Sequence, residues 1–309
     1  MTAILIASCS NRKAKLDGEK IAASQLIEGS YRQVAEDWRI LVKNSQIRCP
    51  AGTLYRGRGA QEISRACGAL RGELWFVSAG LGLIKSSQHV PDYDLTISKG
   101  SHAYIGNKIN CANFDSKKWW SVLGSQNGVH DLASIVKKSG PEVVIFAMPT
   151  AYFNMISQSL DILTLDELSN IRIIGPKAQA INQRYLTFLM PYNERLNSPE
   201  SPLRGTRSDF PQRAAHHFVK YILIKHRSAD NKRHAKMVTA SLNHMQFPEN
   251  IQRKRVSDLE IMNLIIKNWS PCEGKSAMTL RILRDKELIA CEQKRFTKIS
   301  DQVKRQMDK

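Results

Sequence analysis

A thiol, a hydroxyl and an amine stand close together near the start of the chain. In the segment ASCSNRK, Cys9, Ser10 and Lys13 follow the aliphatic run Ala3–Ala7. Positive charge and backbone N–H groups beside a cysteine favour the thiolate, which is the nucleophilic form. The neighbouring basic residues and the turn after the run supply both. The pattern predicts a nucleophilic Cys9, and the alternative is a small buried residue at the end of a strand.

Candidates for proton transfer occur in two segments. Asp94 in VPDYD and His89 in SSQHVP join Lys13 as expected catalytic residues, because each can donate or accept a proton. A carboxylate in a turn is the alternative for Asp94, and a surface-loop histidine is the alternative for His89.

Substrate contacts are expected around a glycine-rich turn. Ser78 and Gly80 in SAGLG follow a strand-like run, and glycine lets a ligand approach the backbone closely. The segment lacks the GxGxxG spacing of a dinucleotide site, so no cofactor is expected. The remaining expected contacts are Ser10, Arg56 and Tyr93.

The first 200 residues alternate aliphatic runs with helical patterns, which indicates an α/β domain. Strands are expected at Ala3–Ala7, Leu74–Ser78, Val143–Ala147, Ile171–Ile174 and Tyr185–Met190. Helices are expected at Ala22–Val42, at Gln61–Leu70 and within AMPTAYFNMISQSL. A mixed sheet with flanking helices places Cys9 at the carboxyl end of the first strand, where open α/β sheets bind ligands.

A composition change marks the expected domain boundary. Residues 194–209, ERLNSPESPLRGTRSD, are rich in Pro, Ser, Gly and charge. We therefore expect a catalytic domain at 1–198, a linker and bridging helix at 199–240, and a third part at 241–309. The helix Pro211–Arg227 either packs on the first domain or bridges the two, and HRSADNKRHAK is expected to be a solvated loop.

The C-terminal part has the pattern of a winged helix-turn-helix. Ser257 and Glu260 form a capping box before LEIMNLIIKNW, and a basic helix, KSAMTLRILRDK, follows a break. ELIACEQ, KRF and TKIS then predict a basic hairpin, the wing. Such a unit binds DNA or, alternatively, protein. The expected nucleic-acid contacts are Lys275, Arg281, Arg284, Lys294 and Arg295.

Charge and composition favour a nucleic-acid partner. The 309-residue chain has a net charge of +18, and residues 201–309 hold 23 of its 46 Lys and Arg residues but only 11 of its 28 Asp and Glu residues. Basic surfaces attract phosphate backbones, although a merely soluble basic protein is the alternative. Six scattered cysteines without metal-site spacing predict free thiols and no metal. With no membrane-length apolar run and no signal segment, we expect a cytoplasmic protein.

Three segments resemble the YaaA-type superfamily. These are ASCSNRK after the first strand, LYRGRG at 54–59, and LWFVSAGLGLI followed by VPDYDLTI. The resemblance covers about residues 3–100 well, and it implies a YaaA-like mixed sheet with flanking helices. The pattern of Cys9, Ser10 and Lys13 is most similar to that of one branch of the superfamily. This branch belongs to a bacterial system that places 7-deazaguanine bases into DNA.

That resemblance implies an activity. Members of this branch act on the 7-cyano group of 7-cyano-7-deazaguanine (preQ0), and a nitrile carbon is a soft electrophile suited to a thiolate. The expected reaction hydrates the nitrile to the amide, giving 7-amido-7-deazaguanine. The expected partners are double-stranded DNA carrying the modified base and other proteins of the same system.

Two other functions stay open at this stage. An N-glycosidase needs a carboxylate beside the anomeric carbon, so it would use Asp92 or Asp94 rather than Cys9. A non-catalytic DNA-binding protein of the YaaA kind would need only the basic surfaces.

Overall fold

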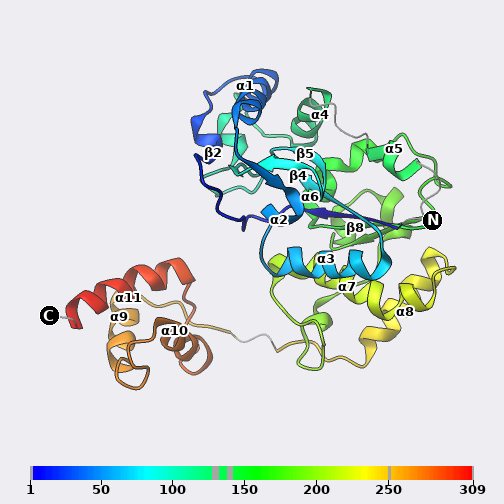
Figure 1. The fold of residues 1–309 in the computed structure, drawn as a ribbon. Coiled ribbons are helices and arrows are strands. Elements are labelled where there is room, and N and C mark those ends of the chain that lie inside the picture. Colours follow the sequence, from blue (N-terminus) through cyan, green and yellow to red (C-terminus); the bar gives the residue numbers. More distant parts are fainter. Residues whose placement is uncertain (1–2, 127–131, 138–141, 250–251, 308–309) are drawn as a thin grey trace. The chain divides into compact units, whose positions relative to one another are not determined.

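A computed structural model describes residues 3–126, 132–137, 142–249 and 252–307. The chain divides into two compact units, Met1–Pro248 and Glu249–Lys309, each with a hydrophobic core of its own. The first unit is mixed α/β and the second is helical (Figure 1).

A five-stranded sheet organises the first unit, in the order β5-β4-β1-β8-β9. The central strand β1 pairs in parallel with β4 and β8, β8 pairs in parallel with β9, and β5 runs antiparallel to β4. The bounds are β1 Ile4–Ser8, β4 Glu73–Ser78, β5 Gly82–Lys85, β8 Val144–Ala147 and β9 Ile171–Ile174. Four of the five predicted strands are therefore confirmed. Two short pairs lie outside this sheet, β2 (Ile21–Ala22) with β7 (Tyr93–Asp94), and β3 (Arg48–Pro50) with β6 (His89–Pro91).

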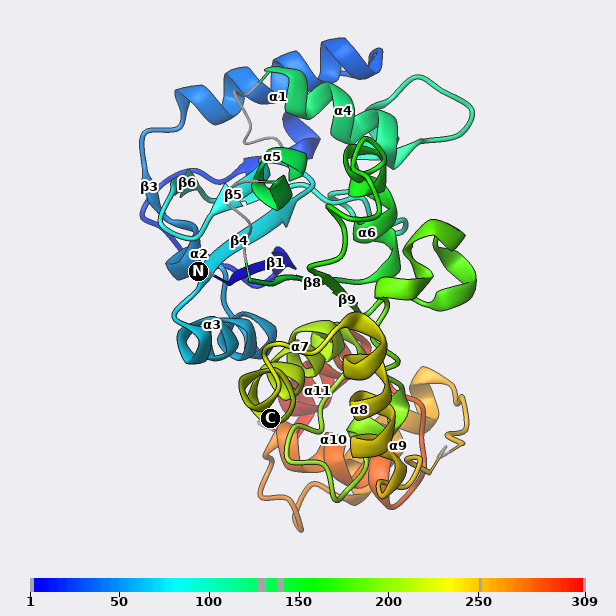
Figure 2. The ribbon, with the colours of Figure 1, turned by 90° about the vertical axis from the view of Figure 1, so that its right-hand side faces the viewer.

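Helices cover both faces of this sheet. In Figures 1 and 2, α3 (Arg58–Leu70) and α7 (Phe210–Tyr221) lie side by side on one face. The opposite face carries α1 (Tyr31–Asn44), α4 (Ser116–Gln126) and α6 (Thr150–Ile156). The other helices of this unit are α2 (Ala51–Leu54), α5 (Leu132–Lys137) and α8 (Asn231–Asn243).

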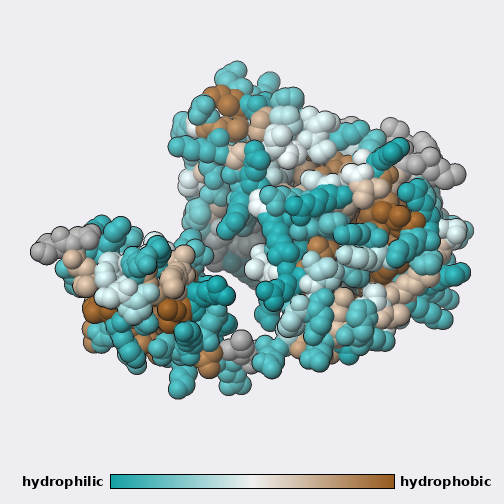
Figure 3. Space-filling view, turned by 60° about the horizontal axis from the view of Figure 1, so that its bottom comes forward, coloured by the Kyte–Doolittle hydropathy of each residue, from teal (hydrophilic) through white to brown (hydrophobic). Residues whose placement is uncertain are grey.

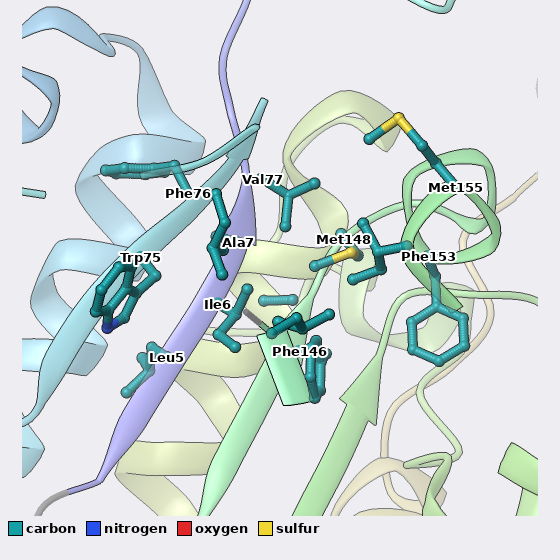
Figure 4. Close-up of a cluster of buried hydrophobic side chains, with 14 of the residues drawn as sticks. Leu5, Ile6, Ala7, Trp75, Phe76, Val77, Phe146, Met148, Phe153 and Met155 are labelled. Carbon is teal, nitrogen blue, oxygen red and sulfur yellow. The ribbon is translucent and has the colours of Figure 1, made fainter. Parts of the chain in front are cut away.

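The core lies where β1 meets its two neighbours. Figure 4 shows Leu5, Ile6 and Ala7 of β1 between Trp75–Val77 of β4 and Phe146 of β8. All of these side chains are buried, as expected for parallel strands covered on both faces. The surface in Figure 3 is largely hydrophilic, with smaller hydrophobic patches.

Two elements within the first 200 residues differ from prediction for local reasons. The helix expected at Ala22–Val42 begins only at Tyr31, because Ser30 and Gln33 form a capping box there. The strand expected at Tyr185–Met190 is wrong. Residues Gln183–Phe188 form the 3-10 helix η5, whose first turn the Asn182 side chain caps.

The segment expected to be a linker belongs to the first unit. Helix α7 packs on α3, which is one of the two arrangements expected for it. Its Arg213 is fully buried and holds the preceding loop through Asn197 Oδ1 (2.9 Å) and the Leu203 carbonyl (2.6 Å). The solvated loop expected at 226–236 is also wrong in its second half. Helix α8 begins at Asn231 because the Asp230 side chain accepts a hydrogen bond from Arg233 N.

The described part of the second unit contains three α-helices, α9 (Asp258–Lys267), α10 (Ser276–Asp285) and α11 (Gln293–Met307). The capping box of Ser257 and Glu260 is present at the start of α9. The predicted wing is wrong, because one continuous helix, α11, replaces the basic turn and the returning strand. Phe296, Ile299 and Val303 recur at helical spacing and are buried along this helix.

Candidate active site at the end of the central strand

A cavity of about 560 Å³ opens at the carboxyl end of β1. Its walls come mainly from residues 8–12 after β1, 55–60 at the start of α3, 149–152 at the start of α6, and 206–212 at the start of α7. The chain leaves β1 for β4 on one side and later returns to β8 on the other. Such a reversal of strand order creates the crevice in which open α/β sheets bind ligands.

Cys9 lies in this crevice, directly after β1. Its backbone N–H donates to the Val77 carbonyl (3.0 Å), which holds it level with the end of β4. Its Sγ lies 3.7 Å from the hydroxyl of Tyr152, which α6 supplies from the other side. Burial, followed by the charge of Cys9, raises the pKa of Tyr152 well above its usual value. The cavity therefore pairs a thiol with a phenol that stays protonated at neutral pH.

A chain of buried hydroxyls lies near Cys9. The Tyr93 hydroxyl contacts those of Tyr55 (2.8 Å) and Ser78 (2.6 Å). Burial raises the pKa values of both tyrosines well above the usual range, and the charge of Cys9 raises them further. Tyr55 lines the cavity, whereas Tyr93 and Ser78, both expected to contact substrate, use their hydroxyls inside the protein.

Lys13 is close enough to interact with the Cys9 charge. Its Nζ lies 4.2 Å from the centre of the Tyr93 ring, and its backbone forms an antiparallel bridge with Tyr55. Burial lowers the pKa of Lys13, while a negative charge on Cys9 opposes that shift. Lys13 therefore releases a proton more readily than an exposed lysine, as a proton-transfer group beside the thiol requires.

The loop carrying Cys9 is fixed to the LYRGRG segment. Ser10 Oγ donates to the Arg56 carbonyl (2.8 Å) and accepts from Arg12 N (3.1 Å). Gly57 has a φ of +92°, and a Cβ there would lie 3.2 Å from the Arg12 side chain. Arg12, Arg56 and Arg58 all line the cavity, which gives this wall positive charge.

Asp94, His89 and Gly80 lie outside the cavity wall, and so does Lys13. Asp94 Oδ2 contacts His102 Nε2 (2.8 Å) and lies 3.9 Å from Lys20 Nζ. His89 is exposed on β6, where it pairs with β3. Gly80 is closed to a ligand, because a Cβ there would lie 3.0 Å from the Tyr93 ring and 3.2 Å from Trp38.

Sequence reasoning missed several cavity residues. Tyr55 lies inside LYRGRG and Tyr152 lies inside AMPTAYFNMISQSL, so their segments were recognised but their hydroxyls were not. Asp209 and Gln212 come from the start of α7, about 200 residues after Cys9. No local pattern connects them with the thiol.

The predicted nucleic-acid contacts of the second unit fall into two groups. Lys275 pairs with Glu273, and Arg281 pairs with Asp285 (3.7 Å), so the basic face of α10 is partly neutralised. Lys294 is exposed at the start of α11.

Arg284 and Arg295 instead line an open depression of about 540 Å³. Arg253 and Arg255, which sequence reasoning did not select, line it as well. Arg284 donates to the Cys291 carbonyl (2.7 Å), and Arg295 donates to the Val256 carbonyl (2.8 Å), which fixes both guanidinium groups. Arg295 also pairs with Asp258 (2.6 Å) and Arg253 with Asp285 (3.4 Å), so the charge here is partly neutralised too. This arginine depression is a candidate phosphate-binding surface.

Within the described residues, no group of three or more His, Cys, Asp or Glu side chains is arranged to hold a metal ion. None of the described helices is long and apolar enough to cross a membrane. No protein-family model matches the chain, and no curated protein matches it. The resemblance to the YaaA-type superfamily therefore rests on the motifs within residues 3–100.

Proposed function

We propose that this chain, as a YaaA-type protein, hydrates the nitrile of 7-cyano-7-deazaguanine in double-stranded DNA to the carboxamide. The observation that carries the proposal is the 3.7 Å approach of the Cys9 thiol to the Tyr152 hydroxyl in a cavity at the strand-order reversal. A nitrile needs a nucleophile at carbon and a proton donor at nitrogen, and this pair supplies both.

The proposed reaction has two stages. The Cys9 thiolate adds to the nitrile carbon, and Tyr152 protonates the nitrogen, which gives a thioimidate. Lys13 accepts the thiol proton before this addition. Water then adds to the same carbon, and expulsion of the thiolate leaves the carboxamide. As the thiolate leaves, the proton lost from the added hydroxyl returns to the Tyr152 phenolate, and Lys13 gives its proton back to the Cys9 thiolate. The net change is therefore the addition of one water molecule, with Cys9, Tyr152 and Lys13 in their starting states.

The described geometry favours this chemistry over glycosidic cleavage. The carboxylates expected for an N-glycosidase, Asp92 and Asp94, do not line the cavity. The carboxylate that does line it, Asp209, accepts a hydrogen bond from the buried Arg213 guanidinium at 2.6 Å. Cys9 instead has a group beside it that can protonate a substrate, the Tyr152 hydroxyl.

DNA is the proposed partner because of the charge distribution. The cavity wall carries three arginines, and the second unit carries the arginine depression. We propose that this second unit binds DNA as a helix-turn-helix module, and that the target base swings out of the duplex to reach Cys9. The six free cysteines are consistent with a reducing cytoplasm. Other proteins of the same modification system are further proposed partners.

Mass spectrometry of nucleosides tests the proposal. A duplex carrying one 7-cyano-7-deazaguanine is incubated with the protein and digested. The modified nucleoside is expected to gain the mass of one water. An abasic site among the products would identify a glycosidase, and an unchanged nucleoside on bound DNA would leave only the DNA-binding function.

A further inference from the structure

Gln212 places an unpaired hydrogen-bond acceptor in the wall of the cavity. The residue is 6% exposed, and its Nε2 donates to Ser8 Oγ at 3.1 Å. Its Oε1 is buried and has no hydrogen-bond partner among the described residues. Because unpaired buried acceptors cost free energy, this oxygen indicates a donor that arrives with a ligand.

Hydrogen bonds hold the wall around that acceptor, and the residue facing it carries no side chain. Asp209, one turn before Gln212, accepts from Arg213 Nε (2.6 Å) and Thr206 N (3.0 Å), which fixes the start of α7. Opposite them is Gly59, where a Cβ would lie 3.4 Å from Gln212 Oε1 and 3.6 Å from Asp209 Cβ. A Cβ at Gly59 would touch the acceptor, so glycine leaves this side of Gln212 without a side chain against it.

The two sides of the cavity differ in hydrogen-bonding character. The wall formed by residues 206–212 contains the side-chain oxygens of Asp209 and Gln212. The wall formed by residues 8–12 and 55–60 contains the Cys9 thiol and the guanidinium donors of three arginines. A guanine-type base has the complementary arrangement. Its N1–H and 2-amino donors lie on the Watson–Crick edge, across the ring system from a substituent at position 7.

We propose that Gln212 is a specificity-determining residue, whose Oε1 accepts a hydrogen bond from N1–H or the 2-amino group of a guanine-type base. This inference rests on the proposed function, because it assumes that the base enters the Cys9 cavity. An adenine-type base presents an unprotonated N1 at the same edge, so it would face Gln212 with a second acceptor. A site built to receive a donor rejects an analogue that lacks it.

Binding of two free nucleosides tests the inference without turnover. Equilibrium dialysis compares 7-cyano-7-deazaguanosine with 7-cyano-7-deazaadenosine on the full chain in a Cys9→Ala background. We expect the guanine-type nucleoside to bind about tenfold more tightly or better. Gln212→Leu is expected to remove this preference by weakening only the guanine-type nucleoside. Gln212→Glu keeps an acceptor at the same place and is expected to keep the preference.

Failure of the inference and failure of the proposed function give different results. Three results would overturn the inference. Gln212→Leu could weaken the binding of both nucleosides equally, Gln212→Leu could leave the preference for the guanine-type nucleoside unchanged, or the Cys9→Ala protein could show no preference at all. A preference that depends on Gln212, found in a protein that does not hydrate the nitrile, would support the inference while the proposed chemistry fails. Thermal melting of each variant, with Ser8→Ala as the control for loss of the Nε2 contact, shows whether the fold is retained.

Discussion

Acid is expected to destabilise the first unit through His217, which lies on the same helix as Gln212. His217 is 3% exposed, and its Nδ1 lies 2.9 Å from the Tyr192 hydroxyl. Burial, with smaller contributions from the charges of His216 and His244, lowers the pKa of His217 from 6.5 to about 4. The folded chain therefore holds this imidazole neutral at pH values where the unfolded chain protonates it.

The sign and size of the effect follow from this shift. Because the folded pKa is the lower one, stability is complete above pH 6.5, decreases as the pH falls, and stops changing below about pH 4. A shift from 6.5 to about 4 corresponds to about 3 kcal/mol in total. Roughly 2 kcal/mol of this is lost between about pH 7.5 and about pH 5.

Urea unfolding of the wild type and His217→Asn at these two pH values measures the effect. The asparagine Oδ1 replaces Nδ1 as an acceptor for Tyr192 and does not titrate. The loss of unfolding free energy on acidification should therefore be smaller in His217→Asn by about 2 kcal/mol. His89→Asn, at an exposed histidine, should behave as the wild type. Equal losses in His217→Asn and the wild type would show that His217 does not cause the loss of stability in acid.

Three further perturbations have defined outcomes. Tyr152→Phe should slow nitrile hydration about a hundredfold with unchanged DNA affinity, since it removes only the proton donor, and an unchanged rate would exclude Tyr152 as the acid. Arg255→Ala should lower DNA affinity and reduce the slope of log affinity against log salt by about one. Arg281→Ala should change the DNA affinity and the salt slope less than Arg255→Ala does, because Asp285 already pairs with Arg281. A larger effect of Arg281→Ala than of Arg255→Ala would contradict the assignment of the arginine depression as the phosphate-binding surface. Ser257→Ala should destabilise α9 by about 1 kcal/mol, measured as faster hydrogen exchange of its amides in the full chain, and unchanged exchange would mean that the cap contributes nothing.

The parts of the fold that were predicted depend on local signals. The aliphatic runs of β1, β4, β8 and β9 are covered on both faces, so hydrophobicity alone locates them. The Ser257 capping box is likewise readable within four residues. The errors at Tyr185–Met190 and in the wing come from short segments, whose few apolar residues do not separate a period of two from a period of 3.6.

The site shows the same division between local and long-range information. Cys9, Ser10 and Arg56 were identified because they lie in two short motifs, ASCSNRK and LYRGRG, which the hydrogen bond from Ser10 Oγ to the Arg56 carbonyl joins. Asp94 was misplaced because β7 is extended, so Tyr93 and Asp94 point to opposite sides. Tyr152 and Gln212 reach the cavity only through the packing of α6 and α7 on the sheet. A sequence without aligned relatives carries no signal for such contacts.

The rate of nitrile hydration in Cys9→Ala shows whether the Cys9 thiol is the nucleophile. Cys49→Ala is the matched control, because Cys49 is another partly buried free thiol and does not line the cavity. With a duplex carrying 7-cyano-7-deazaguanine, we expect Cys9→Ala to bind the DNA but form no amide, while Cys49→Ala retains the wild-type rate. Amide formation by Cys9→Ala at the wild-type rate would contradict nucleophilic catalysis by Cys9.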